Sequence, residues 1–122
     1  VAVLRPRLEK KQRAEAIRRA FQHHGKPYDF NFDFGTADKL VCSELLYHAY
    51  EGLLDFQMET VLGKKVITPL GIMNKFANEH GTPSRQLDFV LFLDTPPGDK
   101  HASLADAEAC CESVTRSKAF NE

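Results

Sequence analysis

The sequence predicts a mixed α+β domain, and three observations lead to this class. Short apolar segments of strand type occur near the start, in the first third and late in the chain. Longer segments between them repeat apolar residues at steps of three and four, the period of a helix. The 122 residues, of which 43% are hydrophobic and 27% charged, suit one globular domain. The predicted order is strand, helix, strand, helix, helix, strand, helix, with three strands in a thin sheet.

The first two predicted elements are a strand over residues 1–4 and a helix over residues 7–24. The strand is apolar and β-branched, and it stops at Arg5-Pro6 because proline lacks an N–H donor and restricts the residue before it. Gly25 suits the position just past the end of the helix. The helical side chains expected to face inward are Ala14, Ile17, Ala20 and Phe21.

Residues 28–34 predict the second strand, because aromatic side chains alternate there with polar ones. The predicted aromatic face consists of Tyr28, Phe30, Phe32 and Phe34. Residues 35–38 predict a turn, and a hydrophobic helix follows from Leu40 to near Asp55. Its apolar stripe consists of Val41, Leu45, Leu46, Ala49, Tyr50, Leu53 and Leu54.

The rest of the chain predicts one more helix, one more strand and a polar tail. Residues 56–67 give a weak pattern that we interpret as a loop or short turn. Thr68-Pro69 provides an N-cap and a first-turn proline for a helix that Gly81 closes. Residues 87–93 form a buried-type strand. Beyond residue 97, Ser103 and Asp106 predict the start of a helix to about Arg116, in an appendage or linker rather than in the core. The inward positions of the Thr68 helix are Ile72, Met73, Phe76 and Ala77.

Composition and charge exclude several classes of protein. No apolar run reaches the roughly 18–20 residues that a membrane span needs. A formal net charge of -1 does not attract nucleic acid or anionic lipid, so binding of either would need a local basic patch. The basic first helix carries Glu9 and Glu15 at i,i+4 spacing to arginines, so we interpret it as a solvated face and expect no nucleic-acid partner. Three cysteines, with Cys110 next to Cys111, predict neither a disulfide framework nor a metal knuckle.

Cys42 is the most informative residue, because it lies where the hydrophobic helix begins. Helix N-termini expose free N–H groups and a partial positive charge, which stabilise a thiolate. Backbone amides there can also form an oxyanion hole. These features favour a nucleophile. The alternative is a small buried side chain without chemistry, because free cysteine is among the most often buried residue types.

The residues around Cys42 form a pattern of three elements. These are V-x-R-P at 3–6, G-x-P-Y-D at 25–29 and C-S-E-L at 42–45, with Ala49 and Tyr50 after it. The pattern covers roughly residues 1–94 and resembles the permuted papain-like cysteine hydrolases of the YiiX/YaeF type, relatives of the NlpC/P60 peptidases. The resemblance implies a circularly permuted papain-like (NlpC/P60) α+β fold that is incomplete at its N-terminus. Residues 1–97 would be the half that bears the nucleophile, and residues 98–122 a polar tail or helical appendage.

By this resemblance Cys42 is the catalytic nucleophile of a thiol-dependent hydrolase of amidase or peptidase type. Tyr28 is expected to line the substrate pocket and Ser43 to lend its N–H to an oxyanion hole, while Glu44 complements the helix N-terminus. The expected substrate is a small-molecule, peptide or lipid-type acyl compound with an amide or ester bond. No metal and no other cofactor is required. The alternative function is a non-catalytic papain-like interaction domain.

The histidine base that such a thiol needs is expected upstream of Val1, because the family's permutation places it before the cysteine. We therefore expect an upstream half of the same polypeptide. The chain itself contains five histidines: His23, His24, His48, His80 and His101. The first two lie in the last turn of the first helix, where an imidazolium favours the helix dipole. The third is six residues after Cys42 and faces another side of the helix. None of the five is a convincing base, and His24 is the least unsuitable.

Overall fold

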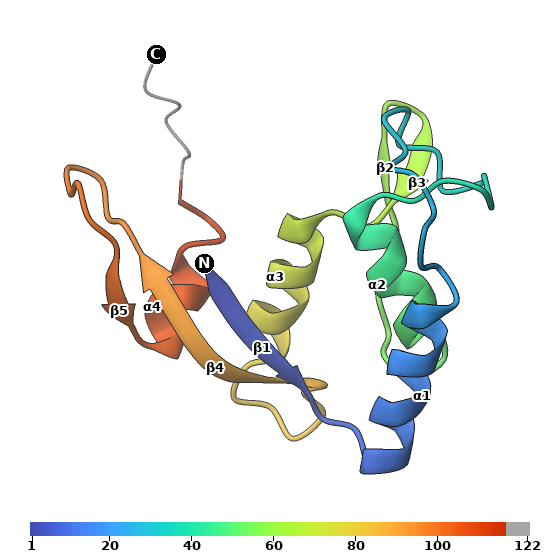
Figure 1. Cartoon of the computed structure of the whole chain (residues 1–122). Coiled ribbons are helices and arrows are strands. Elements are labelled where there is room, and N and C mark those ends of the chain that lie inside the picture. The colour runs from blue at the N-terminus through green and yellow to red at the C-terminus, as the bar shows by residue number, and fades with distance from the viewer. Residues whose placement is uncertain (117–122) are drawn as a thin grey trace. The chain divides into compact units, whose positions relative to one another are not determined.

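The computed structural model describes residues 1–116, which fold into two compact units. One unit holds Val1–Arg7 together with the described residues from Met73 onward, and the other holds Leu8–Ile72. Both units contain helix and strand, consistent with the predicted α+β class (Figure 1). No helix in residues 1–116 is long and apolar enough to span a membrane.

The first unit is built on a three-stranded antiparallel sheet in the order β1-β4-β5 (Figure 1). Its strands are β1 (Ala2–Pro6), β4 (Leu87–Asp94) and β5 (Ser103–Ala105). Strand β1 pairs with β4 from Ala2 opposite Phe92 to Pro6 opposite Leu87. Both strands predicted for this region are confirmed, and β1 extends through the proline, which an edge strand tolerates.

Side-chain caps start both helices of this unit, at the predicted residue for α3 and later than predicted for α4. Helix α3 (Pro69–Glu79), most of which lies in this unit, starts where the Thr68 hydroxyl accepts the Gly71 N–H at 2.9 Å. It buries the Phe76 side chain to 1% exposure. Helix α4 (Ala107–Glu112) starts where the Asp106 carboxylate accepts the Ala109 N–H at 2.9 Å. Local capping chemistry therefore sets both helix starts.

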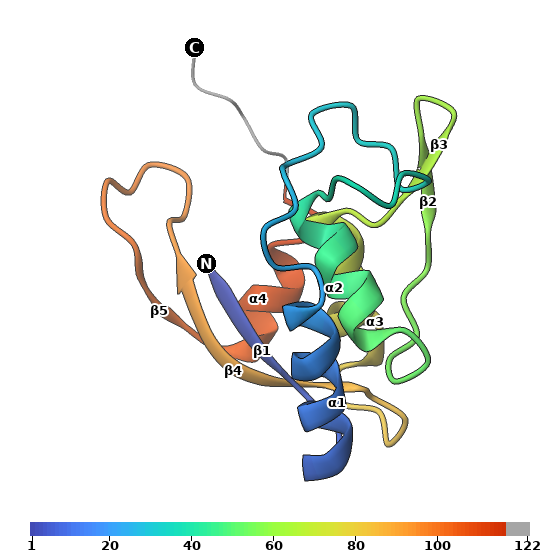
Figure 2. The same cartoon turned by 45° about the vertical axis from the view of Figure 1, so that its right-hand side comes forward.

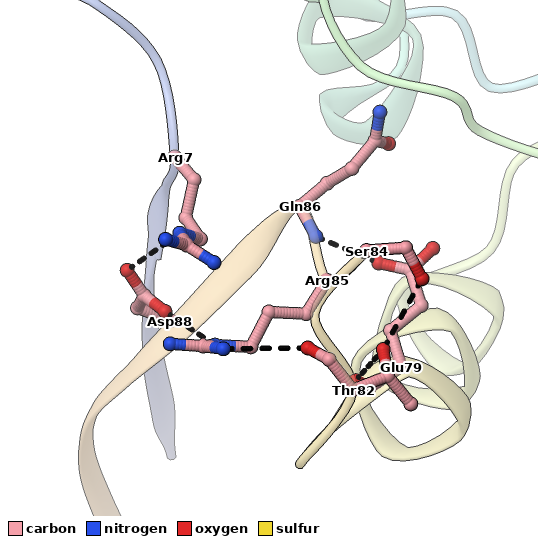
Figure 3. A network of polar contacts seen from close by, with 7 residues as sticks. All are labelled: Arg7, Glu79, Thr82, Ser84, Arg85, Gln86 and Asp88. Atoms are coloured by element: carbon pink, nitrogen blue, oxygen red, sulfur yellow. Dashed lines mark hydrogen bonds and ion pairs between the residues drawn. The ribbon is translucent and has the colours of Figure 1, made fainter.

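A polar network ties the end of α3 to the first two strands of the sheet (Figure 3). The Glu79 carboxylate accepts the Gln86 N–H at 2.9 Å. The Asp88 carboxylate lies between two guanidinium groups, at 2.9 Å from Arg85 Nε and 3.5 Å from Arg7 Nε. The Asp88 carboxylate of β4 thus contacts Arg7, the residue just after β1, and holds this end of β1 against the start of β4.

The segment after residue 97 differs from its prediction. Residues 103–105 form strand β5 on the edge of β4 instead of opening a helix, so that part of the prediction is wrong. The helix that follows ends at Glu112, and its Cys110 is fully buried. The Arg116 guanidinium donates twice to the Asp94 carboxylate, each time at 2.9 Å. Pairing with β4, which single-sequence periodicity does not report, sets the structure of this segment.

The second unit packs two helices together and carries a small hairpin. Helix α1 (Lys10–Phe21) contacts α2 (Cys42–Tyr50), and β2 (Glu59–Val61) pairs with β3 (Lys64–Val66). Both helices are shorter than predicted, because turns at residues 22–25 and 51–54 follow them. The hairpin lies within residues 56–67, for which the sequence pattern predicts only a loop or short turn.

The predicted inward face of α1 is wrong. Its buried residue is Ala16, whereas Ile17 and Phe21 are exposed and Ala14 faces solvent. Small side chains allow α1 to approach α2 closely, and contact with α2 decides the buried face. The Glu15 side chain on this helix accepts hydrogen bonds from Arg18 and Arg19, which lower its pKa to about 2.

The aromatic strand predicted at residues 28–34 is also wrong. The segment is a loop, and its one β-type contact is an isolated bridge between Tyr28 and Leu40. The buried Asp29 carboxylate accepts the N–H groups of Asn31 (2.9 Å) and Asp33 (2.7 Å). These bonds curl the backbone into turns and take the donors that a strand would use.

Candidate functional site

Cys42 is the first residue of α2, and its side chain is exposed. The N-cap residue Val41 has no side-chain atom that can accept a hydrogen bond. The first helical bond runs from the Leu45 N–H to the Val41 carbonyl at 3.1 Å. Within residues 1–116 the N–H groups of Cys42 and Ser43 donate to no protein acceptor. An exposed thiol thus stands beside free donors at the positive end of a helix, and the alternative of a buried cysteine is wrong here.

The buried carboxylate of Glu44 stabilises the start of this helix. Its side chain is 1% exposed, and one carboxylate oxygen accepts the Val41 N–H at 3.3 Å. The other oxygen lies 3.5 Å from Nε2 of His48 and has no hydrogen-bond partner. The position agrees with the expectation that Glu44 complements the helix N-terminus, since a carboxylate in the first turn opposes the positive helix end.

The imidazole of His23, on the turn after α1, stacks on the imidazole of His48 in α2, beside Glu44. The rings of His23 and His48 lie 5.3 Å apart at an interplanar angle of 17°. The His23 Nδ1 atom is buried without a hydrogen-bond partner. Burial lowers the pKa of the His23 imidazole, the nearby Lys26 and His48 side chains lower it further, and the Glu44 carboxylate opposes this in part. Helix α1 ends at Phe21, so His23 lies in the turn after the helix and not in its last turn, where the sequence predicted it.

A cavity of about 260 Å³ opens beside this pair of imidazoles. Lys26, Leu40 and residues 34–37 complete its wall. The Lys26 ammonium donates to the Ala37 carbonyl at 2.6 Å and so holds the loop over the cavity. Cys42 is not part of the wall, which fits the prediction that His48 faces another side of α2. In the described part of the chain, no three His, Cys, Asp or Glu side chains are placed to hold a metal ion.

The two predicted substrate-binding residues lie on either side of the helix start. Tyr28 is half-exposed on the loop, and its bridge to Leu40 places its backbone beside the segment that leads into Cys42. The Ser43 side chain is buried, so its backbone N–H rather than its hydroxyl is the group free to act. Of the remaining histidines, His24 lies on the turn after α1 and makes no hydrogen bond or ion pair with Cys42 within the second unit, while His80 and His101 belong to the first unit.

Sequence reasoning missed Asp29 as an organiser of the site. Its carboxylate holds two backbone N–H groups of the loop, and its own N–H donates to the Leu40 carbonyl at 3.0 Å. One residue thus shapes the loop and ties it to the chain just before Cys42. The available signal was the spacing D-x-N-x-D at residues 29–33, because Asp and Asn side chains favour turns over strands.

Asp29 gives a pH-dependent prediction. Hydrogen bonds from the backbone N–H groups of Asp33 and Asn31 lower the pKa of its carboxyl group. The loop is therefore stabilised above the ordinary Asp pKa of about 3.9, and this stabilisation is lost as pH falls through the lower folded value. We expect protection of the Asn31 and Asp33 amides from hydrogen exchange to fall only below about pH 4. Asp29→Asn should lower the protection of these two amides several-fold at neutral pH.

The control for this experiment is Asp38→Asn, because Asp38 is exposed on the same loop. It should leave the exchange of both amides unchanged. Equal protection in Asp29→Asn and the parent protein would show that the carboxylate does not organise the loop.

Comparison with known proteins gives one family. A family model described as permuted papain-like amidase enzyme, YaeF/YiiX, matches residues 1–89. The matched span includes β1, α1, the Asp29 loop and the start of α2. Neither the curated proteins nor the solved structures contain a match to the chain.

Proposed function

The chain belongs to the permuted papain-like amidase family YaeF/YiiX, which supports a hydrolase-type function, and we propose that Cys42 is its nucleophile. The observation that carries this proposal is the exposed thiol at the N-terminus of α2, beside the free N–H groups of Cys42 and Ser43. A thiolate there gains from the partial positive charge of the helix end. The thiol is also open to a carbonyl carbon, whereas Cys110 is buried.

The proposed reaction is hydrolysis of an amide or ester bond. The Cys42 sulfur attacks the carbonyl carbon, and the free N–H groups of Cys42 and Ser43 stabilise the oxyanion that forms. The histidine base takes the thiol proton as the sulfur attacks, the resulting imidazolium gives this proton to the leaving amine or alcohol, and an acyl-enzyme remains on sulfur. Water then attacks the acyl group, the base takes the water's proton, and the thiol is restored. By resemblance, the base is a histidine on a strand that precedes the cysteine in a permuted papain-like fold.

The other residues support this reaction by position. Tyr28 forms part of the acyl pocket, since its loop joins the chain just before Cys42. Glu44 holds the Val41 N–H and so leaves the next two N–H groups for the substrate. We take residues 1–97 as the half that bears the nucleophile; after them, strand β5 pairs with β4 and Cys110 is buried, so the described residues beyond 97 belong to the first unit rather than to a separate appendage. No step needs a metal or an organic cofactor.

The test is alkylation of the native chain and of the denatured chain by iodoacetamide at pH 7, with each cysteine resolved by mass spectrometry. We expect Cys42 to react several times faster in the native chain, because the helix end stabilises its thiolate. Cys110 and Cys111 serve as internal controls, since burial raises the pKa of both thiols and should slow their reaction in the native chain. Native protection of Cys42 would instead favour the non-catalytic interaction domain.

A further inference from the structure

The two carboxylate oxygens of Glu44 are both buried, but only one of them is held by a hydrogen bond. Oε2 accepts the Val41 N–H at 3.3 Å. Oε1 accepts no hydrogen bond within residues 1–116. A buried carboxylate oxygen without a donor is costly, so a donor is expected beside it. The nitrogen found there is Nε2 of His48, which lies 3.5 Å from Oε1 and four residues further along α2.

This contact decides which nitrogen of His48 carries a proton. A neutral imidazole has a proton on one nitrogen and a lone pair on the other. If Nε2 carried the lone pair, that lone pair would face the buried carboxylate oxygen, and the two would repel each other. With a proton on Nε2, the contact becomes attractive and gives Oε1 its missing donor. The carboxylate therefore selects the Nε2–H form of the ring, whether the ring is neutral or charged.

The His23 ring holds the His48 ring in this orientation. The two ring centroids lie 5.3 Å apart at an interplanar angle of 17°, so the rings stack. Burial, together with the nearby Lys26 side chain, lowers the pKa of the His23 imidazole and favours its neutral form. A neutral ring can lie against His48 without repelling the proton that faces Glu44. Figures 1 and 2 both show the end of α1, which leads into His23, beside α2.

A fixed Glu44 carboxylate keeps the start of α2 open for substrate. The N–H groups of Cys42 and Ser43 donate to no protein acceptor within residues 1–116, and the proposed reaction uses them for the oxyanion. Glu44 lies in the same first turn, and the positive helix end attracts its charge. A carboxylate held by one oxygen alone can rotate toward these free donors and compete with the substrate oxyanion. Contact of Oε1 with His48 opposes this rotation.

We propose that His48 is a positioning residue for the oxyanion donors: its Nε2–H binds Oε1 of Glu44 and so fixes the carboxylate on the Val41 N–H. The inference rests on the proposed function, because that function assigns the Cys42 and Ser43 N–H groups to an oxyanion. His48 acts through Glu44 and not on the substrate, because it lies six residues after Cys42 and faces another side of α2.

The first test is ¹⁵N NMR of the histidine rings of the chain at about pH 8, where an imidazole with the ordinary pKa of about 6.5 is neutral. We expect Nε2 of His48 to carry a proton, and loss of the signal in His48→Leu assigns it. A bare Nε2 would overturn the proposal. This readout involves neither hydrolysis nor the reactivity of Cys42, so it stands whatever the alkylation experiment gives.

The second test compares two substitutions of His48. His48→Leu removes the donor, whereas His48→Gln supplies an amide donor to the same oxygen. We expect the Val41 amide to exchange several-fold faster in His48→Leu than in the parent chain, and His48→Gln to restore most of its protection. The matched control is His24→Leu, because His24 is exposed on the same turn as His23. It should leave the exchange of the Val41 amide unchanged. Equal exchange in folded His48→Leu and in the parent chain would overturn the proposal.

The third test measures hydrolysis by the full-length protein. His48→Leu should lower kcat about tenfold and leave KM unchanged, because the N–H groups act on the oxyanion rather than on the bound substrate. His48→Gln should recover most of the loss, and circular dichroism with thermal melting checks the fold of each variant. An unchanged kcat in folded His48→Leu would overturn the positioning role. Hydrolysis by Cys42→Ala would instead overturn the proposed function, and the NMR result for His48 would remain.

Discussion

Cys42→Ala in the full-length protein is expected to reduce hydrolysis of a chromogenic acyl ester to the uncatalysed rate. The reason is that no other group at the start of α2 can form the acyl-enzyme: Val41 is apolar and the Ser43 side chain is buried. Loss of the nucleophile costs at least about 10³-fold in turnover in enzymes of this kind. The measurement is the steady-state rate of chromophore release, with mass spectrometry of the protein to detect an acyl group on Cys42.

Cys111→Ala is the matched control for this loss. It changes the same residue type in the first unit, on a partly buried thiol outside the proposed site. It should leave both the rate and the acyl adduct intact. If Cys42→Ala hydrolyses the ester as fast as the parent protein, or if the adduct forms on another residue, the thiol mechanism is wrong. Cys42→Ser distinguishes chemistry from shape, because it keeps the size of the side chain and removes the thiolate.

The elements that the sequence predicted well carry their signal locally. Pro6 marks the end of β1, and Thr68-Pro69 begins α3 with a cap that the structure confirms. The continuous apolar run at residues 87–93 forms β4. In these places a dihedral restriction, a capping oxygen or a buried run is enough to decide the element, whatever packs against it.

The elements that it missed depend on turn chemistry or on partners far away in the chain. The alternation of aromatic residues at 28–34 has the period of a strand, but the Asp29 carboxylate competes successfully for the backbone donors. The β2–β3 hairpin turns at Leu62-Gly63. Leucine stands there with a positive φ in place of the asparagine or aspartate that usually marks such a turn, so the sequence did not indicate it. Strand β5 exists because β4 offers it an edge. In each of these three segments, interactions compete for the same backbone groups. A hydrophobic pattern does not tell which of the competing interactions is stronger.

Some features of the candidate site could likewise be predicted from local sequence, and others could not. The placement of Cys42 at a helix start could be predicted, because the turn before it and the apolar stripe after it fix where α2 begins. The contact of Glu44 with His48 follows from their i,i+4 spacing. The stack of His48 on His23 could not be predicted, because it needs the packing of α1 against α2 and a turn that brings His23 inward.

Phe76→Ala is expected to give the largest loss of stability in the chain, about 3–5 kcal/mol in the free energy of unfolding. Phe76 is 1% exposed and is the largest of the fully buried side chains in residues 1–116. Its ring lies 6.4 Å from the Phe89 ring of β4 and 5.2 Å from the His80 ring. Alanine would remove these contacts and leave a cavity between α3 and the sheet that neighbouring side chains fill only in part. Urea unfolding followed by circular dichroism measures the change.

Phe21→Ala is the control for this cavity, because the same substitution falls at a helical phenylalanine that is 74% exposed. It should change the free energy of unfolding by no more than about 0.5 kcal/mol. Phe76→Leu should recover part of the loss, since leucine fills part of the space and keeps the surface apolar. A loss in Phe76→Ala no larger than in Phe21→Ala would contradict the packing described here. It would mean that the contact of α3 with β4 does not hold the first unit together.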